Sequence, residues 1–160
     1  MGSGKSTYGR LIANKLGCSF IDTDHYIEKK EGRSISVIFS DDGEEYFRDV
    51  ETDVLKEVLG NNELKVISLG GGTPLRKENR ELMKKGYTIF LKVSAEEAYE
   101  RLKHDSKRPL LKVADPKGRI AELLEQRDPI YESAADYVLY EEKKSLDDIF
   151  LELSKVVKEI

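Results

Sequence analysis

The sequence predicts an α/β protein with three layers, in which a parallel sheet carries helices on both faces. Segments with helical and strand-like hydrophobic spacing alternate along the whole 160-residue chain, a pattern typical of parallel sheets. Residues 2–7 read Gly-Ser-Gly-Lys-Ser-Thr immediately before a helical pattern, and Gly70-Gly71-Gly72 directly follows an apolar strand pattern. Ligands bind to parallel sheets at loops in such positions.

The first half of the chain is expected to contain two strands and four helices. Tyr8, Leu11, Ile12 and Leu16 recur at helical spacing and Gly17 follows them, which predicts a helix over residues 6–16. Short apolar runs predict strands, and helical spacing predicts further helices. The strands are expected at 18–21 and 65–69, and the helices at 24–30, 35–40 and 44–59.

The second half continues the alternation but contains one irregular stretch. Strands are expected at 87–93 and 137–140, and helices at 77–85, 95–102 and from Leu146 to the end of the chain. Residues 104–118 are polar, contain two prolines and lack periodicity. A loop of this length in a compact domain is usually a lid or a disordered segment. We favour a lid, because basic residues and Leu110-Leu111 could fold over phosphates.

The length and composition are those of one ordinary domain, residues 1–160. A domain of this length can bury about two-thirds of the surface that its unfolded chain exposes. The net charge of −4 argues against a nucleic-acid partner. The single cysteine, Cys18, cannot form an internal disulfide and fits a small buried residue in a reducing cytoplasm. No apolar run approaches the ~20 residues of a membrane span. We therefore expect a cytoplasmic monomer with a small-molecule substrate and no membrane partner.

The opening motif predicts a phosphate site. In the pattern G-x-x-x-x-G-K-[ST], backbone N–H groups surround a nucleotide's phosphates, the lysine reaches the terminal phosphates and the hydroxyl binds Mg²⁺. The matching residues are Gly2, Ser3, Gly4, Lys5, Ser6 and Thr7, while the first glycine of the pattern would precede Met1. A flexible linker is the alternative reading, but the helix that follows offers its positive N-terminus to an anion.

Two aspartates are candidates for metal binding and proton transfer. Asp22 and Asp24 follow the first strand and, on an extended chain, would project to the same side. One could hold Mg²⁺ through water while the other accepts a hydroxyl proton. The simpler alternative is that Asp24 caps the next helix, although this leaves Asp22 unexplained.

Three arginines are candidates for binding anions. Arg48 lies one helical turn from Glu51, and alone this pair reads as a surface ion pair. Arg127 reads equally as a cation at a helix C-terminus. Together with the triple glycine, however, the two arginines form a plausible site for a carboxylate and hydroxyl groups. Arg108, in the expected lid, could stabilise a transferring phosphate.

The order and spacing of several motifs closely resemble shikimate kinase over nearly the whole chain. These are GSGKST at residues 2–7, DTD at 22–24, GEEYFRDVE at 43–51, LGGGT at 69–73, RPLL at 108–111 and RDPIYESAADY at 127–137. The resemblance implies phosphorylation of the shikimate 3-hydroxyl by ATP, in the biosynthesis of aromatic amino acids. It also implies a P-loop kinase fold similar to nucleoside monophosphate kinases.

The resemblance further implies a role for each matching residue. Gly2 to Thr7 would bind the ATP phosphates, with Ser6 on Mg²⁺ and Asp22 in the outer shell of the metal. Asp24 would contact the substrate hydroxyls and is the candidate base, while Arg48 and Arg127 would grip the carboxylate. Gly70, Gly71 and Gly72 would present backbone groups to the ring. Arg108 would close over the phosphates and Arg101 would stack near the adenine, where Lys143-Lys144 replace an arginine usual in the family.

Family members begin with an apolar strand that lies in the middle of the sheet and is absent from this chain. Losing it would leave backbone groups unpaired on both neighbouring strands. We therefore expect Met1 to be an internal methionine of a longer natural protein, and the chain alone to be weakly stable and a poor binder of ATP.

Three other functions share the opening motif. One is a related small-molecule kinase, such as a gluconate or nucleotide kinase, whereas the triple glycine with Arg48 and Arg127 favours an anionic polyol ring as the substrate. A switch GTPase would carry N-K-x-D after a strand, whereas the Asn14-Lys15 pair lies inside the first helix. A third alternative is an inactive relative that binds a partner.

Overall fold

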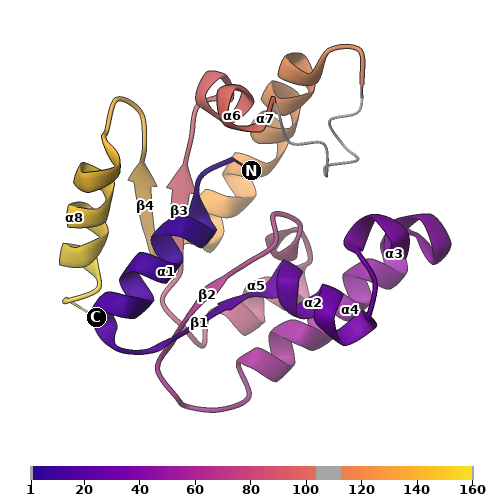
Figure 1. Ribbon diagram of the computed structural model, residues 1–160, viewed down its shortest axis with the longest axis horizontal. Helices are drawn as coiled ribbons and strands as arrows, with labels where there is room; N and C mark the ends of the chain where they lie inside the picture. The colour runs from indigo at the N-terminus through magenta and orange to yellow at the C-terminus, as the bar shows by residue number, and fades with distance from the viewer. Residues whose placement is uncertain (1, 104–112, 160) are drawn as a thin grey trace. The chain divides into compact units, whose positions relative to one another are not determined.

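In the computed structural model, residues 2–103 and 113–159 are described, and they fall into two compact units. One unit comprises residues 6–86, and the other comprises residues 1–5 with 87–160. Each unit contains one pair of parallel strands flanked by helices (Figure 1).

The unit of residues 6–86 is built on two strands, β1 and β2, that lie side by side. Its elements are α1 (Lys5–Leu16), β1 (Ser19–Asp22), α2 (Thr23–Glu31), α3 (Ile35–Asp41), α4 (Gly43–Val58), β2 (Lys65–Ser68), the short helix η1 (Thr73–Leu75) and α5 (Lys77–Met83). In the parallel register Ser19 pairs with Lys65 and Asp22 with Ser68. The carboxyl ends of β1 and β2 therefore meet at one edge of the strand pair. The loop that contains Gly70, Gly71 and Gly72 begins at this edge.

Helix α4 supplies much of the core of this unit. Phe47, Val54, Leu55 and Val58 are buried on one face, as their spacing predicts. Glu51 is buried on the same helix, at 1% exposure. A carboxylate in such a position must have partners, because burying an unpaired charge is costly.

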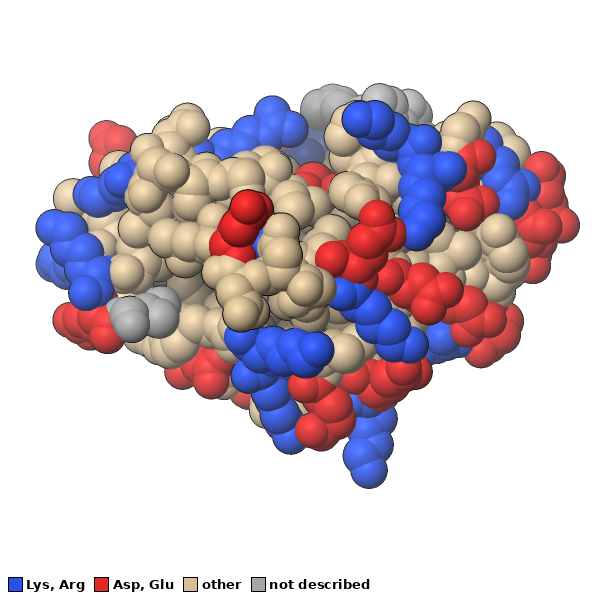
Figure 2. Space-filling view, turned by 90° about the horizontal axis from the view of Figure 1, so that it is seen from below, with Lys and Arg blue, Asp and Glu red and all other residues tan. Residues whose placement is uncertain are grey.

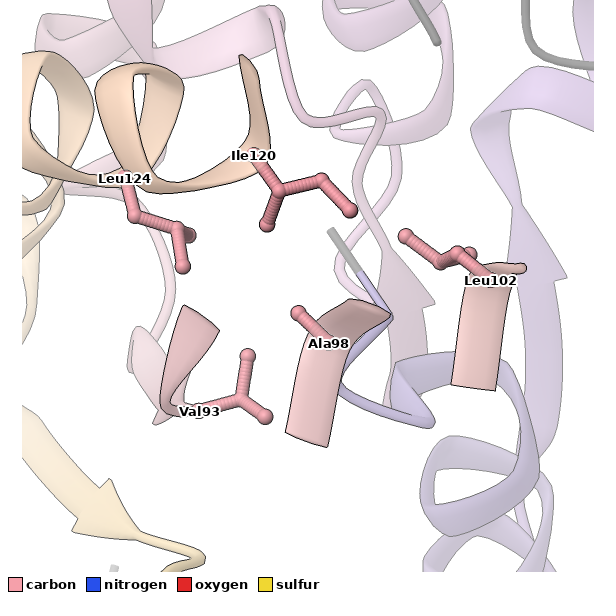
Figure 3. Packing of buried hydrophobic residues seen from close by; sticks show 5 residues of the cluster. All are labelled: Val93, Ala98, Leu102, Ile120 and Leu124. Carbon is pink, nitrogen blue, oxygen red and sulfur yellow. The ribbon is translucent and has the colours of Figure 1, made fainter. Parts of the chain in front are cut away.

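The second unit pairs β3 (Ile89–Lys92) with β4 (Tyr137–Tyr140), again in parallel. Its helices are α6 (Ala95–Leu102), α7 (Pro116–Ala134) and α8 (Leu146–Val156). Helices α6 and α8 begin with capping boxes at Ser94 and Ser145. A buried apolar cluster joins α6 and α7 to the end of β3 (Figure 3); its members are Val93, Ala98, Leu102, Ile120 and Leu124.

The prediction of parallel strands alternating with helices is confirmed. The strands form two separate pairs, and several are shorter than expected, because the structure pairs only four residues in each. The helix at 95–102 and the strand at 137–140 were predicted with their observed limits. The short helix η1 was not predicted, and for helix α7 only an end near Arg127 was expected.

Helix α7 corrects two predictions. Residues 116–118, assigned to the lid, form the first turn of this helix, where the side chain of Asp115 accepts a hydrogen bond from the N–H of Gly118. Proline at the first helical position fits this start, since its missing N–H would have no partner there. Arg127 lies within α7 rather than at its end, because the helix continues through Pro129. Residues 104–112 of the expected lid lie outside the described residues.

Charged side chains of both signs are interspersed on the face drawn in Figure 2. Many form exposed ion pairs, including Lys30 with Glu57 and Lys56 with Glu78. Such pairs contribute little stability individually. Across the described part of the chain, no helix is both long enough and apolar enough to span a bilayer.

Candidate active site

Ser6 and Asp22 are brought together at the carboxyl edge of β1 and β2. The Ser6 hydroxyl donates a 2.6 Å hydrogen bond to Oδ2 of Asp22. Its Oγ also lies 3.4 Å from Oγ of Ser68, which ends β2. Three side-chain oxygen atoms therefore lie close together here, and oxygen is the ligand type that Mg²⁺ prefers.

Asp22, rather than Asp24, caps helix α2. Oδ1 of Asp22 accepts hydrogen bonds from the N–H groups of Asp24 and His25, at 3.1 and 3.4 Å. The alternative in which Asp24 is the cap is therefore wrong, and so is the extended chain assumed between the two aspartates. Asp24 lies in the first turn of α2, where the helix dipole favours a carboxylate.

The loop of residues 70–72 is held close to Asp24 by Thr23. The buried Thr23 hydroxyl accepts a hydrogen bond from the N–H of Gly70 at 3.0 Å and donates to the carbonyl of Ser68 at 3.3 Å. A Cβ at Gly70 would lie 2.5 Å from Oδ1 of Asp24 and 2.8 Å from Oε1 of Glu51. The absence of a side chain at Gly70 thus allows two carboxylates to approach the loop backbone.

Arg48 is held in place by a buried carboxylate. Its Nη1 donates to Oε2 of Glu51 at 2.9 Å, and its Nη2 donates to Glu44 at 2.9 Å. The other oxygen of Glu51 accepts a 2.6 Å bond from the Thr73 hydroxyl. The side chain of Arg48 is only 11% exposed, so the reading of Arg48 and Glu51 as a surface pair is wrong.

The guanidinium of Arg48 lies directly against the triple glycine. A Cβ at Gly72 would overlap Nη1 and Cζ of Arg48. The aromatic rings of Phe39 and Phe47 lie 5.9 and 5.2 Å from the guanidinium carbon, at cation–π distances. Arg48 and Gly72 are therefore in contact, as the carboxylate-site hypothesis requires.

Helix α5 fixes the far end of the same loop. The buried Asn79 amide donates to the carbonyl of Thr73 at 2.9 Å. Arg80 donates to the carbonyls of Pro74 and Leu75, at 2.7 and 2.9 Å. The backbone of residues 70–75 is thereby anchored by side chains on both α2 and α5.

The other unit contains the remaining described site residues. Gly2 to Lys5 belong to it, while Ser6 and Thr7 belong to residues 6–86. Arg101 contacts the carbonyl of Gly2 and the carboxylate of Glu141. Lys144, expected near the adenine, donates to Glu152 at 2.5 Å.

The described contacts do not test the roles predicted for two other arginines. Arg127 is half-buried on α7, in the unit that contains residues 87–160. Arg108 lies outside the described residues. Their roles remain predictions.

Burial and charge act in opposite directions on the Arg48–Glu51 pair. Burial raises the pKa of Glu51 above its usual value, although Thr73 and Arg48 counteract it. Burial acts to lower the pKa of Arg48, but the charges and hydrogen bonds of Glu51 and Glu44 outweigh it and raise that pKa. Arg48 therefore stays a cation at any physiological pH.

Glu51→Gln should change how stability depends on pH. Because the pKa of Glu51 is raised in the folded protein, the native state binds this proton more tightly than the unfolded chain does. Wild type should therefore lose stability relative to the Gln variant as pH rises from about 4 through the raised pKa. The loss is about 1.4 kcal/mol for each tenfold difference in proton affinity. Urea unfolding of both proteins across this range measures it.

Glu57→Gln provides the control for this pH series. The pKa of Glu57 is lowered by its hydrogen bonds to Lys30 and Tyr26. The contribution of Glu57 to stability is therefore present above the usual Glu pKa and is lost as pH falls. This pH dependence is opposite in sign to that expected from Glu51. A difference between wild type and Glu51→Gln that does not vary with pH would contradict the assignment.

Sequence reasoning missed the residues that position the candidate groups. Thr23, Ser68, Thr73, Asn79 and Glu141 were not among the site candidates. A polar residue at the carboxyl end of a parallel strand was the available signal for Ser68 and Glu141. For Asn79 the sequence carried no comparable signal, because its role depends on how α5 folds back on the loop.

Comparisons with known proteins bear on the family and the fold of this chain. The family model described as shikimate kinase matches residues 1–158. This chain belongs to the shikimate kinase family. Shikimate kinases are ATP-dependent phosphotransferases that act on a hydroxyl group of shikimate, and this member is accordingly a transferase and a kinase.

Individual relatives show how far the similarity extends. The chain is 43% identical over 160 residues to the shikimate kinase of Thermodesulfovibrio yellowstonii, covering 99% of this chain and 90% of the relative. It is 43% identical over 147 residues to that of Cupriavidus pinatubonensis, covering 91% and 76%. The family match decides against a gluconate or nucleotide kinase and against a switch GTPase.

Solved structures give the same result for the fold. Shikimate kinase from Acinetobacter baumannii, in complex with shikimate, superposes with a TM-score of 0.90 at 36% identity, covering 99% of this chain and 89% of that one. The shikimate kinase of Aquifex aeolicus gives 0.82 at 38% identity, covering 99% and 93%. The predicted P-loop kinase fold is thereby confirmed.

Proposed function

We propose that this chain transfers the γ-phosphoryl group of ATP to the 3-hydroxyl of shikimate, using the residues described above. One observation carries the proposal. Arg48, the triple glycine and Asp24 are tied together within one unit, by Glu51, Thr73 and Thr23. A fixed guanidinium beside exposed loop backbone suits a ligand with a carboxylate and several hydroxyls. Arg127 is proposed as the second cation for the carboxylate.

The proposed reaction needs positioning and positive charge more than covalent chemistry. The hydroxyl oxygen of shikimate attacks the γ-phosphorus, the bond from that phosphorus to the β–γ bridging oxygen breaks, and Asp24 accepts the hydroxyl proton. Lys5 and the N–H groups of residues 2–7 hold the phosphates. Arg108 is proposed to contact the transferring phosphate. Arg101 is proposed to contact the adenine, with Lys144 near the same base.

The oxygen ligands around Ser6 fit a magnesium ion. The set consists of hydroxyl and carboxylate oxygens, and Mg²⁺ commonly keeps several waters and takes few protein ligands. We propose that Ser6 binds the metal directly and Asp22 holds one of its waters. When bound, Mg²⁺ neutralises charge on the outer phosphates. We also propose a cytoplasmic location, which the lone Cys18 supports, and a monomeric state.

The test is an ADP-release assay with shikimate, gluconate and AMP as separate acceptors. We expect ADP release only with shikimate, and a product phosphorylated at the 3-hydroxyl by phosphorus NMR. Asp22→Asn should raise the Mg²⁺ concentration needed for half-maximal activity at least tenfold, since the metal loses a charged partner, equal to ~1.4 kcal/mol. Asp53→Asn, on the exposed side of α4, is the matched control. Turnover without shikimate, or an unchanged Mg²⁺ requirement, would contradict the proposal.

A further inference from the structure

Arg101 links a buried carboxylate to the start of the phosphate loop. Its Nη1 donates to Oε2 of Glu141 at 2.6 Å and to the carbonyl oxygen of Gly2 at 2.9 Å. Glu141 is 0% exposed, whereas the side chain of Arg101 is 37% exposed. All three residues belong to the same compact unit.

The backbone around Glu141 is fixed by the ends of β3 and β4. Its N–H donates to the carbonyl of Lys92 at 2.9 Å, and its own carbonyl accepts from the N–H of Lys144 at 3.0 Å. Oε1 of Glu141 is buried and has no hydrogen-bond partner within the described part of the chain. A buried carboxylate depends on a paired cation, and Arg101 is the cation that bonds Glu141 within the described residues.

Gly2 lies against α6, the helix that carries Arg101. It has a φ of +71°, and a Cβ there would lie 3.2 Å from Cα and O of Ala98 and from Cδ1 of Leu102. Helix α6 therefore contacts Gly2 through both its apolar face and Arg101. The start of the loop has little freedom to move while Arg101 stays in place.

Fixing the carbonyl of Gly2 also fixes the next N–H group. A trans peptide is planar, and its C=O and N–H point in opposite directions. With the Gly2 oxygen held toward Arg101, the N–H of Ser3 must point away from it. A phosphate loop works through N–H groups that are oriented before the ligand arrives.

We propose that Glu141 and Arg101 are a positioning pair that orients the Gly2–Ser3 peptide for binding the phosphates of ATP. The inference rests on the proposed role of residues 2–7 in that binding. Neither side chain needs to touch a phosphate for this effect. Glu141 acts through Arg101, and Arg101 acts through the carbonyl of Gly2.

The test uses Glu141→Gln, which keeps the size of the side chain but removes its charge. We expect the KM for ATP to rise about fivefold, while kcat and the KM for shikimate change less than twofold. Glu142→Gln, the exposed neighbour, should leave all three unchanged. A change in melting temperature with an unchanged KM for ATP would show a merely structural role and overturn the proposal.

Inorganic triphosphate distinguishes the phosphate loop from the adenine site. It carries no base, so its inhibition constant against ATP reports on the loop alone. We expect Glu141→Gln to weaken the binding of triphosphate by the same factor as the binding of ATP. If the variant binds ATP more weakly but binds triphosphate as wild type does, Glu141 only orients Arg101 toward the adenine. The proposal would then fail.

A double-variant cycle tests whether Glu141 acts through Arg101. In an Arg101→Met background, Glu141→Gln should have no further effect on triphosphate binding, whereas additive effects would overturn the inference. Lys5→Met separates this result from the proposed function. If Lys5→Met leaves triphosphate binding intact, residues 2–7 do not bind phosphates and the proposed function itself fails.

Discussion

Arg48→Ala should lower kcat/KM for shikimate about a hundredfold, or ~2.7 kcal/mol of transition-state stabilisation. The variant removes the guanidinium proposed to bind the carboxylate of the substrate. It also leaves Glu51 buried without its cation, which typically costs about 3–5 kcal/mol of folding stability. Steady-state kinetics and urea unfolding measure the two effects separately.

A second variant distinguishes lost binding from lost stability. In Arg48→Met with Glu51→Gln the buried charge is absent, so most of the stability should return while kcat/KM for shikimate stays low. Arg76→Ala is the matched control, because Arg76 pairs with exposed carboxylates of Glu45 and Asp49. Recovery of activity together with stability in the double variant would show that Arg48 is structural and does not bind shikimate.

Gly72→Ala should raise the KM for shikimate at least thirtyfold, about 2 kcal/mol. The new methyl group would occupy the space of the Arg48 guanidinium. Because Glu51 and Glu44 hold that guanidinium from the other side, either the loop or the arginine must shift. A small displacement of a positioning group is enough to lose much of the rate. The KM for ATP should change little.

Gly86→Ala is the control for this substitution. A Cβ there would meet only the carbonyl of Met83, at 4.0 Å. A crystal structure of Gly72→Ala would report the displacement of Arg48 directly. Normal shikimate kinetics in this variant would contradict the contact between Arg48 and the loop.

The sequence predicted the type and order of most elements because their apolar residues are regularly spaced. Helix α6 and strand β4 have the limits expected from that spacing. The limits of helix α7 were missed because its start, Pro116-Lys117-Gly118, reads as a loop. Asp115 and Pro116 satisfy the first turn, and Ile120 and Leu123 bury one face, which outweighs the glycine.

The candidate site was predicted as a set of residues but without its supports. Local spacing placed Arg48 and Glu51 one turn apart, yet it could not show that α4 turns this pair inward. That depends on Thr73, which reaches Glu51 only when the loop folds over α4. Likewise, Asp22 and Asp24 were recognised, but their division of roles depends on where α2 begins.

Asp22 connects two binding events because its two oxygens have different partners. One oxygen receives the Ser6 hydroxyl, and the other holds the first turn of the helix that carries Asp24. A ligand that binds the Ser6 hydroxyl therefore competes for a side chain that also caps that helix. If occupancy near Ser6 changes the affinity for the acceptor, thermodynamic reciprocity requires the acceptor to change the affinity for the first ligand by the same factor. Asp22 is thus the one described side chain bonded both to Ser6 and to the first turn of α2.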